Sequence, residues 1–393
     1  MAGMVPEGQS FVTSSPLQFI PWMSFSPGLG SPFPWLRELK SEERGLYLIH
    51  LLVSCANHVA AAIVEAMEGE KMVHIIDFNC FEPAQWINLF QTFNARPEGP
   101  PHLRITGLHE QKEVLDHMAR RLTEEAQKWD IPFQFNPVVC KLENLDLESL
   151  RVKTGEALAV SSVLQLHSLL VTDDEMHKWK VNSPSMSKID PSHRVLQMNQ
   201  RTLGEWLKKE PVHAYSPSSD LASPSPLSPL SLAPAPKMGS FLTALRALSP
   251  KLIVITEQES NNSGSTLMER VMEALNFYAA LFDCLESTVS RALLERKKVE
   301  KMLFGEEIKN IIACEGVERK ERHEKLEKWI LRLELAGFGR VPLSYHGMLQ
   351  AGRLLQTNNY DGYKIKEENG CLVICWQERP LYSISAWRFR PYD

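Results

Sequence analysis

One segment, residues 73–86, resembles the first strand and turn of a nucleotide-binding α/β unit, but its glycines are missing. Apart from His74, the run from Val73 to Ile76 is apolar, as in a parallel strand that is buried on both faces. Asp77 falls at the carboxyl end of that strand, where open α/β sheets place their ligands. A cofactor would need glycine in the next turn so that the backbone can approach it closely. The turn contains instead Asn79, Cys80, Phe81, Glu82 and Pro83.

Charge and cysteine content exclude several classes of protein. The 393 residues have a formal net charge of −5, so no broad basic field is available for sequence-independent binding to nucleic acid. The seven cysteines lack the spacing of a small disulfide-bonded domain, which favours a reducing compartment. Cys371 and Cys375 are closest together, and without a nearby histidine they are better interpreted as buried thiols than as zinc ligands. We expect a soluble protein that is not secreted, since no membrane span or signal peptide is visible.

Proline and serine mark two stretches that are not expected to join the core. Residues 1–39 carry Ser-Pro pairs among glycines and predict a disordered tail, and residues 171–239 predict a long Ser/Pro-rich surface insertion. The insertion is either an inert linker or a target of proline-directed kinases, because a phosphate would add strong negative charge there. The candidate phosphorylation sites are Ser216, Ser223, Ser225 and Ser228.

Elsewhere, apolar strands alternate with helical patterns, which predicts a parallel sheet with crossover helices. The expected parallel strands are 73–77, 103–107, 133–135 with 138–139, 156–163 continued by 164–170, and 252–256. The expected helices are 46–67, 84–95, 113–129, 266–285, 291–304 and 318–335. An Asn369-Gly370 turn then predicts a hairpin between residues 363–366 and 372–376, before a last strand at 382–387. Five parallel strands followed by an antiparallel hairpin is the plan of class I methyltransferases, a Rossmann-type α/β fold.

Five motifs, in order, resemble those of the GRAS family of plant transcriptional regulators. They are Val73-His-Ile-Ile-Asp77, Leu103-Arg-Ile-Thr-Gly107, Leu158-Ala-Val-Ser-Ser162 before Leu166-His-Ser-Leu-Leu170, Ala313-Cys-Glu-Gly316 before Glu321-Arg-His-Glu324, and Ser385-Ala-Trp387. The resemblance covers residues 36–60 and essentially everything from 63 onward. It implies a helical cap on a methyltransferase-like core, nuclear location, and binding to other GRAS proteins, including the DELLA type, and to zinc-finger transcription factors. For the members resembled most, it also implies gibberellin signalling and root development.

The resemblance places the family's named blocks on this chain. The VHIID block is Val73, His74, Ile75, Ile76 and Asp77; the PFYRE-like residues are Pro250, Phe277, Tyr278, Arg319 and Glu321; the SAW block contains Trp376, Ser385, Ala386 and Trp387. Residues 40–393 then form one GRAS domain. Its parts are a remnant of the first leucine-rich region (40–62), the first half of the core (63–170), the insertion (171–239) and the second half of the core (240–393).

The first leucine-rich region departs from the family pattern. After Cys55-Ala-Asn-His58, where the family continues with several helices, this chain passes at once to Ala62-Ile-Val-Glu65. Either the protein is a divergent or alternatively spliced form, or the sequence lacks a segment. We therefore expect a truncated cap, and the dimerisation that the family would imply through its cap is not carried over.

Several of these residues have competing interpretations. His74 lies between apolar neighbours, which favours a hydrogen-bonded core histidine over a catalytic base. Asp77 could bind a ligand or cap the following turn, and the sequence does not decide between the two. Leu48-x-x-Leu51-Leu52 and Leu166-x-x-Leu169-Leu170 match a coactivator-docking pattern, although leucines at this spacing usually belong to a core.

Two further patterns concern packing and charge. Trp376 and Trp387 are expected to pack the terminal hairpin against helices, because a buried indole contributes a large apolar area. Residues 318–328 mix acids and bases at three- and four-residue spacing, which predicts a solvated helix with internal ion pairs.

The sequence contains no catalytic triad, metal-ligand spacing or phosphate loop, so we predict no catalytic residue, no cofactor and no metal. The favoured function is a non-enzymatic transcriptional regulator, a protein-interaction platform that DNA-binding partners bring to promoters. The alternative is a small-molecule methyltransferase that uses S-adenosylmethionine, which would need glycine near residues 79–83. Direct sequence-specific DNA binding is a third hypothesis, but it would require a basic, base-reading helix, and none is evident.

Overall fold

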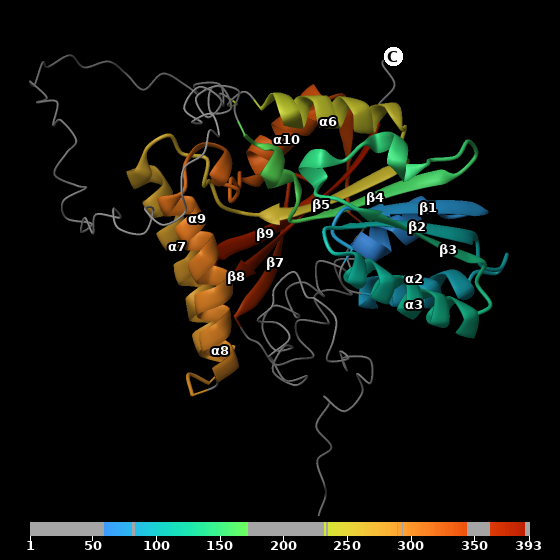
Figure 1. Ribbon diagram of the computed structural model, residues 1–393, viewed down its shortest axis with the longest axis horizontal. Coiled ribbons are helices and arrows are strands. Elements are labelled where there is room, and N and C mark those ends of the chain that lie inside the picture. The colour runs from blue at the N-terminus through green and yellow to red at the C-terminus, as the bar shows by residue number, and fades with distance from the viewer. Residues whose placement is uncertain are drawn as a thin grey trace, which may run out of the picture.

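The computed structural model describes residues 59–80, 83–171, 232, 235–288, 290–292, 294–343 and 362–389. Within these ranges a nine-stranded sheet runs through the molecule in the order β3-β2-β1-β4-β5-β9-β8-β7, and β6 also pairs with β9 (Figure 1). The predicted tail, the first Leu-x-x-Leu-Leu motif and the four candidate phosphorylation sites lie outside the described residues.

The first five strands are parallel, as the sequence predicts. β1 is buried at every position except its first residue, which explains its nearly continuous apolar sequence. β3 ends the strand order and contains Pro137, whose missing N–H costs least in an edge strand. The five strands are β1 (Met72–Asp77), β2 (His102–His109), β3 (Phe133–Val139), β4 (Ala157–Val163) and β5 (Leu252–Gln258).

The second half of the sheet is antiparallel, and the predicted hairpin is confirmed. The turn between β7 and β8 consists of Asn369 and Gly370, whose φ angles of 55° and 77° fit the left-handed turn that such hairpins need. Trp376 donates its Nε1–H to Asp283 Oδ2 at 2.8 Å, and Trp387 is fully buried, so both indoles pack the hairpin as expected. These strands are β6 (Phe338–Val341), β7 (Tyr363–Glu368), β8 (Cys371–Trp376) and β9 (Arg379–Phe389).

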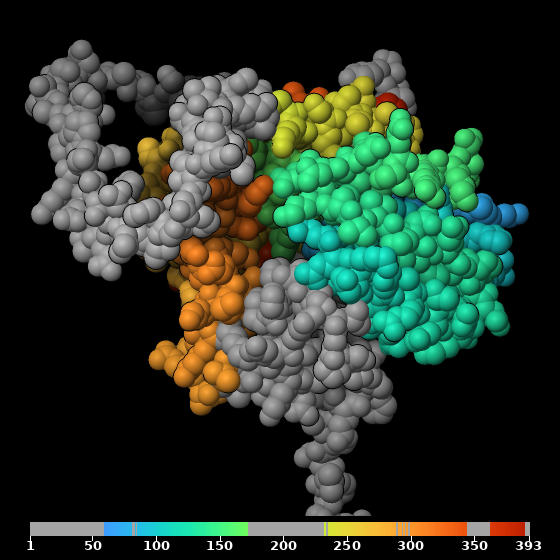
Figure 2. Space-filling view, in the orientation of Figure 1, coloured from blue at the N-terminus to red at the C-terminus, as the bar shows by residue number. Residues whose placement is uncertain are grey.

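Helices cover both faces of the sheet (Figure 1). One face packs against helical residues 59–66, α2 (Ala84–Asn94), α3 (Lys112–Lys128), α7 (Leu267–Thr288) and α9 (Gly305–Ala313). The other packs against α6 (Pro236–Ala247), α10 (Leu326–Leu335) and the 3₁₀ turns η3 (Leu142–Asn144), η4 (Leu147–Leu150) and η5 (Leu166–Leu169). In the space-filling view α6, in yellow, lies directly on the green segment that contains η4 and η5 (Figure 2). The fold is therefore a layered α/β sheet, as predicted.

The prediction that residues 164–170 continue the fourth strand is wrong. Leu164 adopts a positive φ of 54°, and the chain turns away from the sheet into η5. Leu166, Leu169 and Leu170 are at most 5% exposed and pack into the core on the α6 side. This burial fits the core interpretation of the second Leu-x-x-Leu-Leu motif.

The predicted solvated helix at residues 318–328 is also wrong, because α10 begins only at Leu326. Before it, after a short 3₁₀ turn η8 (Gly316–Glu318), the chain has no regular structure, and four of its polar or charged side chains are buried: Arg319, Arg322, His323 and Glu324. Arg322 donates to the carbonyl oxygens of Arg319 and Gly316, at 3.0 and 2.7 Å. These charges are satisfied inside the protein, so their helix-like spacing is misleading.

Several elements were not predicted. Helix α6 begins at Pro236, inside the proline-rich stretch, and α9 and β6 follow patterns too short to stand out. The predicted helix at 291–304 divides into α8 (Leu294–Lys298) and a π-helical turn, Val299–Phe304. No helix within the described ranges is both long and apolar enough to cross a bilayer.

His74 is a core histidine, as predicted. Its Nε2 lies 2.8 Å from Thr106 Oγ1, and its Nδ1 lies 3.0 Å from Arg104 Nη2. Because the guanidinium can only donate, Nδ1 accepts and the ring is neutral; burial and Arg104 together lower the pKa of His74 to about 4. Arg104 is in turn held by Glu156, whose Oε1 accepts its Nε–H at 2.9 Å, and both side chains are at most 6% exposed.

We therefore expect Glu156→Gln to reduce the free energy of unfolding by about 3 kcal/mol, because it leaves the buried Arg104 without its counter-charge. Asp116→Asn is the matched control, since it breaks an exposed pair with Lys112 (N–O distance 2.7 Å) and should cost less than about 1 kcal/mol. Urea unfolding of both variants checks this. Equal, small losses would show that the buried pair contributes no more than the exposed one.

Candidate functional site

Asp77, at the carboxyl end of β1, bonds to its own turn and to the start of α2. Its Oδ1 accepts the backbone N–H of Asn79 at 3.1 Å, and its Oδ2 accepts Trp86 Nε1–H at 3.0 Å and Gln85 Nε2–H at 3.2 Å. Burial raises the pKa of Asp77 to about 6, and these hydrogen bonds limit the rise. Of the two interpretations left open by the sequence, capping of the turn is the one that these contacts support.

Cys80 packs the same turn onto β2. It is fully buried, and its backbone N–H donates to the carbonyl oxygen of Leu108 at 3.0 Å. A Cβ at Gly107 would lie 2.5 Å from Cys80 Sγ and 2.9 Å from the ring of Phe135, so Gly107 admits the thiol rather than a ligand. Pro83 precedes the first residue of α2, whereas Phe81 and Glu82 lie outside the described residues. Atoms of the chain itself therefore occupy the junction of β1 and β2.

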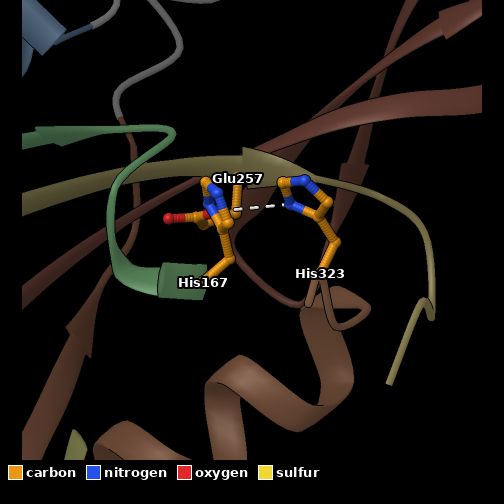
Figure 3. Close-up of side chains that lie close together, drawn as sticks. All are labelled: His167, Glu257 and His323. Atoms are coloured by element: carbon orange, nitrogen blue, oxygen red, sulfur yellow. Dashed lines mark hydrogen bonds and ion pairs between the residues drawn. The ribbon is translucent and has the colours of Figure 1, made fainter. Parts of the chain in front are cut away.

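A second polar cluster lies at the carboxyl ends of β4 and β5 and consists of His167, Glu257 and His323 (Figure 3). Glu257 belongs to β5, His167 to η5 just after β4, and His323 to the irregular segment before α10. Glu257 Oε2 lies 3.1 Å from His167 Nδ1 and 3.8 Å from His323 Nδ1. The two imidazole rings face each other with centroids 4.0 Å apart.

Further hydrogen bonds fix this cluster, which is 1–9% exposed. The backbone N–H of Leu166 donates to Glu257 Oε1 at 2.8 Å. On the other side, Glu321 Oε2 lies 2.9 Å from His323 Nε2 and 3.8 Å from His167 Nε2. The two imidazoles thus lie between two carboxylates, that of Glu257 within the cluster and that of Glu321 beside it.

The surroundings of Glu257 and of His323 shift the pKa of each of these two groups strongly. Burial alone would raise the pKa of Glu257, but His167 and His323 lower it to about 2. Burial alone would lower the pKa of His323, but Glu257 and Glu321 raise it to about 9. Burial and the charge of Glu321 raise the pKa of Glu307 to about 7, and Glu307 Oε2 accepts the hydroxyl of Tyr278 at 2.8 Å. Strong perturbation at the ends of sheet strands marks a candidate functional site.

The motif residues do not converge on one site. Tyr278 and Glu321 reach the surroundings of the histidine cluster, whereas Arg319 donates to the carbonyl oxygen of Gly264 at 3.4 Å. The remaining motif residues have structural roles. Pro250 precedes β5, and Phe277 packs edge-on against Tyr382. Ala386 is in the core, and Ser385 Oγ accepts Trp387 Nε1–H at 2.8 Å. Cys371 and Cys375 are buried free thiols, each 1% exposed.

His167, Glu257 and His323 were not singled out from the sequence as functional residues. One signal was available for Glu257, since a carboxylate at the end of an apolar strand is the same pattern that drew attention to Asp77. His167 lies inside a leucine motif, and His323 lies inside a segment whose charge spacing predicts a solvated helix. Because the three residues are far apart in sequence, no local spacing connects them.

Comparisons of the sequence with protein families and with known proteins all identify GRAS proteins. The GRAS domain family model matches residues 48–388. Scarecrow-like protein 3 of Arabidopsis thaliana is 50% identical over 483 aligned positions, which cover 98% of each chain. GRAS family protein TF80 of Medicago truncatula is 59% identical over 329 residues, or 84% of this chain and 73% of that protein. DELLA proteins are among the further matches.

Among solved structures, the crystal structure of SCL7 from Oryza sativa is similar with a TM-score of 0.66 and 27% identity, covering 86% of this chain and 79% of that one. The alignment with Scarecrow-like protein 3 is longer than the 393 residues of this chain, so part of that relative has no counterpart here. This length difference is consistent with the expected truncation of the cap.

The raised pKa of Asp77 predicts a pH dependence of stability. The carboxyl has a pKa of about 6 when folded and near 3.8 when unfolded, so the folded chain holds this proton more tightly. The stability that it contributes is complete below about pH 4 and is lost as the pH rises through 6. In urea titrations, the free energy of unfolding of the native chain minus that of Asp77→Asn should fall by up to about 3 kcal/mol from pH 4 to pH 7. A difference that does not vary with pH would contradict this.

Proposed function

This chain belongs to the GRAS domain family, and from that premise we propose that it is a transcriptional regulator that works as a protein-interaction platform, without catalysis. GRAS proteins, among them Scarecrow-like and DELLA proteins, are transcriptional regulators in plant signalling. For this chain we propose action in the nucleus, in gibberellin signalling and root development. Its proposed partners are other GRAS proteins, including the DELLA type, and zinc-finger transcription factors.

The proposal that the protein is not an enzyme rests on one observation: the chain's own side chains fill the space at the carboxyl end of β1. In a methyltransferase with this sheet, a glycine-rich turn lets the cofactor approach the carboxyl end of the first strand. Here Asp77 accepts three hydrogen bonds from its own turn and from α2, and Cys80 packs on Gly107. These contacts support a protein that retains the frame of an enzyme and uses its surfaces for binding.

Charge supports recruitment to DNA through partners. The chain has 43 Lys and Arg against 48 Asp and Glu, and many of its bases are already paired with acids. Arg296 contacts both Glu286 and Glu300, at 2.6 and 2.7 Å, and Lys320 contacts Glu143 at 2.9 Å. Each phosphate contact needs a cation that is free to make it, so direct binding to DNA should be weak near physiological salt.

A gel-shift assay near physiological salt tests this proposal. We expect the purified chain alone to leave promoter DNA unshifted, and to supershift the complex of that DNA with a zinc-finger partner taken from a binding screen. The partner with DNA but without this chain is the control. Specific retention of DNA by this chain alone would favour direct binding instead.

A further inference from the structure

We propose that His167, Glu257 and His323 form a binding site for one divalent transition-metal ion, with Zn²⁺ as the reference cation. Each residue offers one ligand atom, and these atoms all lie within 4.8 Å of one another (Figure 3). The proposal differs from the sequence-based expectation of no metal, because the three ligands come from three distant segments. This proposed metal site does not depend on the proposed recruitment of the chain to promoters by DNA-binding partners.

The distances suit a small cation. Glu257 Oε2 is 3.1 Å from His167 Nδ1 and 3.8 Å from His323 Nδ1. Ligands on a tetrahedral zinc, with bonds of about 2.0–2.1 Å, are about 3.3 Å from one another. The ligand nitrogens of the two imidazoles are within 4.8 Å of each other, so an ion between the three atoms would require the tilted rings to turn and bring these nitrogens closer by up to about 1.5 Å.

The far side of His323 is arranged as in a metal site. Glu321 Oε2 lies 2.9 Å from His323 Nε2 and 3.8 Å from His167 Nε2. A carboxylate there stabilises a proton on Nε2, so that the lone pair of Nδ1 points toward the metal, a common arrangement around zinc-binding histidines. The sequence motif that contains Glu321 thereby supplies the second layer of the site.

One atom supports a missing ligand independently of this geometry. His323 Nδ1 is buried, points toward Glu257, and has no hydrogen-bond partner in the described part of the chain. Buried polar atoms are rarely left without a partner, because the desolvation cost is then not recovered. A cation beside the Glu257 carboxylate would give His323 Nδ1 a partner.

The three ligands indicate which ions the site would bind, and their burial indicates that the ion would have a structural role. Two imidazoles and one carboxylate suit Zn²⁺ or another late first-row ion, whereas Mg²⁺ and Ca²⁺ prefer sites made only of oxygen. Glu257 and His323 are each 1% exposed, so the ion would be enclosed. It would join the exit of β4, the end of β5 and the segment before α10, and so stabilise this end of the sheet.

The test is titration of the full chain, after dialysis against a chelator, with ZnCl₂ in a calorimeter. We expect one equivalent of zinc per chain and a rise in melting temperature with added zinc. His323→Gln should weaken binding at least about tenfold. His117→Gln, on α3 and away from the cluster, and Cys375→Ser are controls that should bind as the native chain does. Absence of stoichiometric binding, or equal affinity of His323→Gln and the native chain, would overturn the proposal.

Cobalt provides a test that needs no substitution and therefore no refolding of a variant. The native chain with one equivalent of Co²⁺ should show the visible absorption of a tetrahedral site without the thiolate charge-transfer band that cysteine ligands produce. An octahedral spectrum, or a strong thiolate band, would overturn the proposal by placing the ion elsewhere. If His167, Glu257 and Glu321 form only a charged network with His323, cobalt will give no protein-bound spectrum.

Discussion

Burial of the Asp77 carboxylate at the end of β1 is the constraint on which the surrounding structure depends. A carboxylate that is 1% exposed needs hydrogen-bond donors, and three come from the turn and α2. Meeting that need fixes the turn, orients the buried indole of Trp86 and brings Cys80 onto Gly107 of the neighbouring strand. One unexposed charge thus closes the position at which similar sheets accept a ligand.

The sheet contains a second carboxylate in an equivalent place, and its surroundings give it the opposite behaviour. Glu257 lies one residue before the end of β5, much as Asp77 lies at the end of β1, and each is only 1% exposed. Neutral donors surround Asp77, so burial prevails and its pKa rises to about 6, whereas His167 and His323 lower the pKa of Glu257 to about 2. The side chains around each carboxylate therefore determine its role. Asp77 caps its own turn, whereas Glu257 lies beside two histidines that stabilise its charged form.

The parts of the fold that could be predicted are those with a local cause. An unbroken apolar run gives β1, and an Asn-Gly pair with two positive φ angles gives the last hairpin. The failures have tertiary causes. Leu164 turns the chain out of the sheet, and the leucines after it pack into the core on the α6 side. Arg319, Arg322 and Glu324 are buried charges in a segment whose charge spacing resembles that of a helix. The histidine cluster joins three segments, and no spacing rule in the sequence could bring them together.

We infer that the chain's own residues close this sheet to S-adenosylmethionine. Calorimetric titration of S-adenosylmethionine into the full chain tests this most directly, with an active class I methyltransferase as the positive control. We expect no heat beyond dilution for this chain, because Asp77 and Cys80 already bond and pack within the turn that such a cofactor would approach. A stoichiometric complex with micromolar affinity would contradict it.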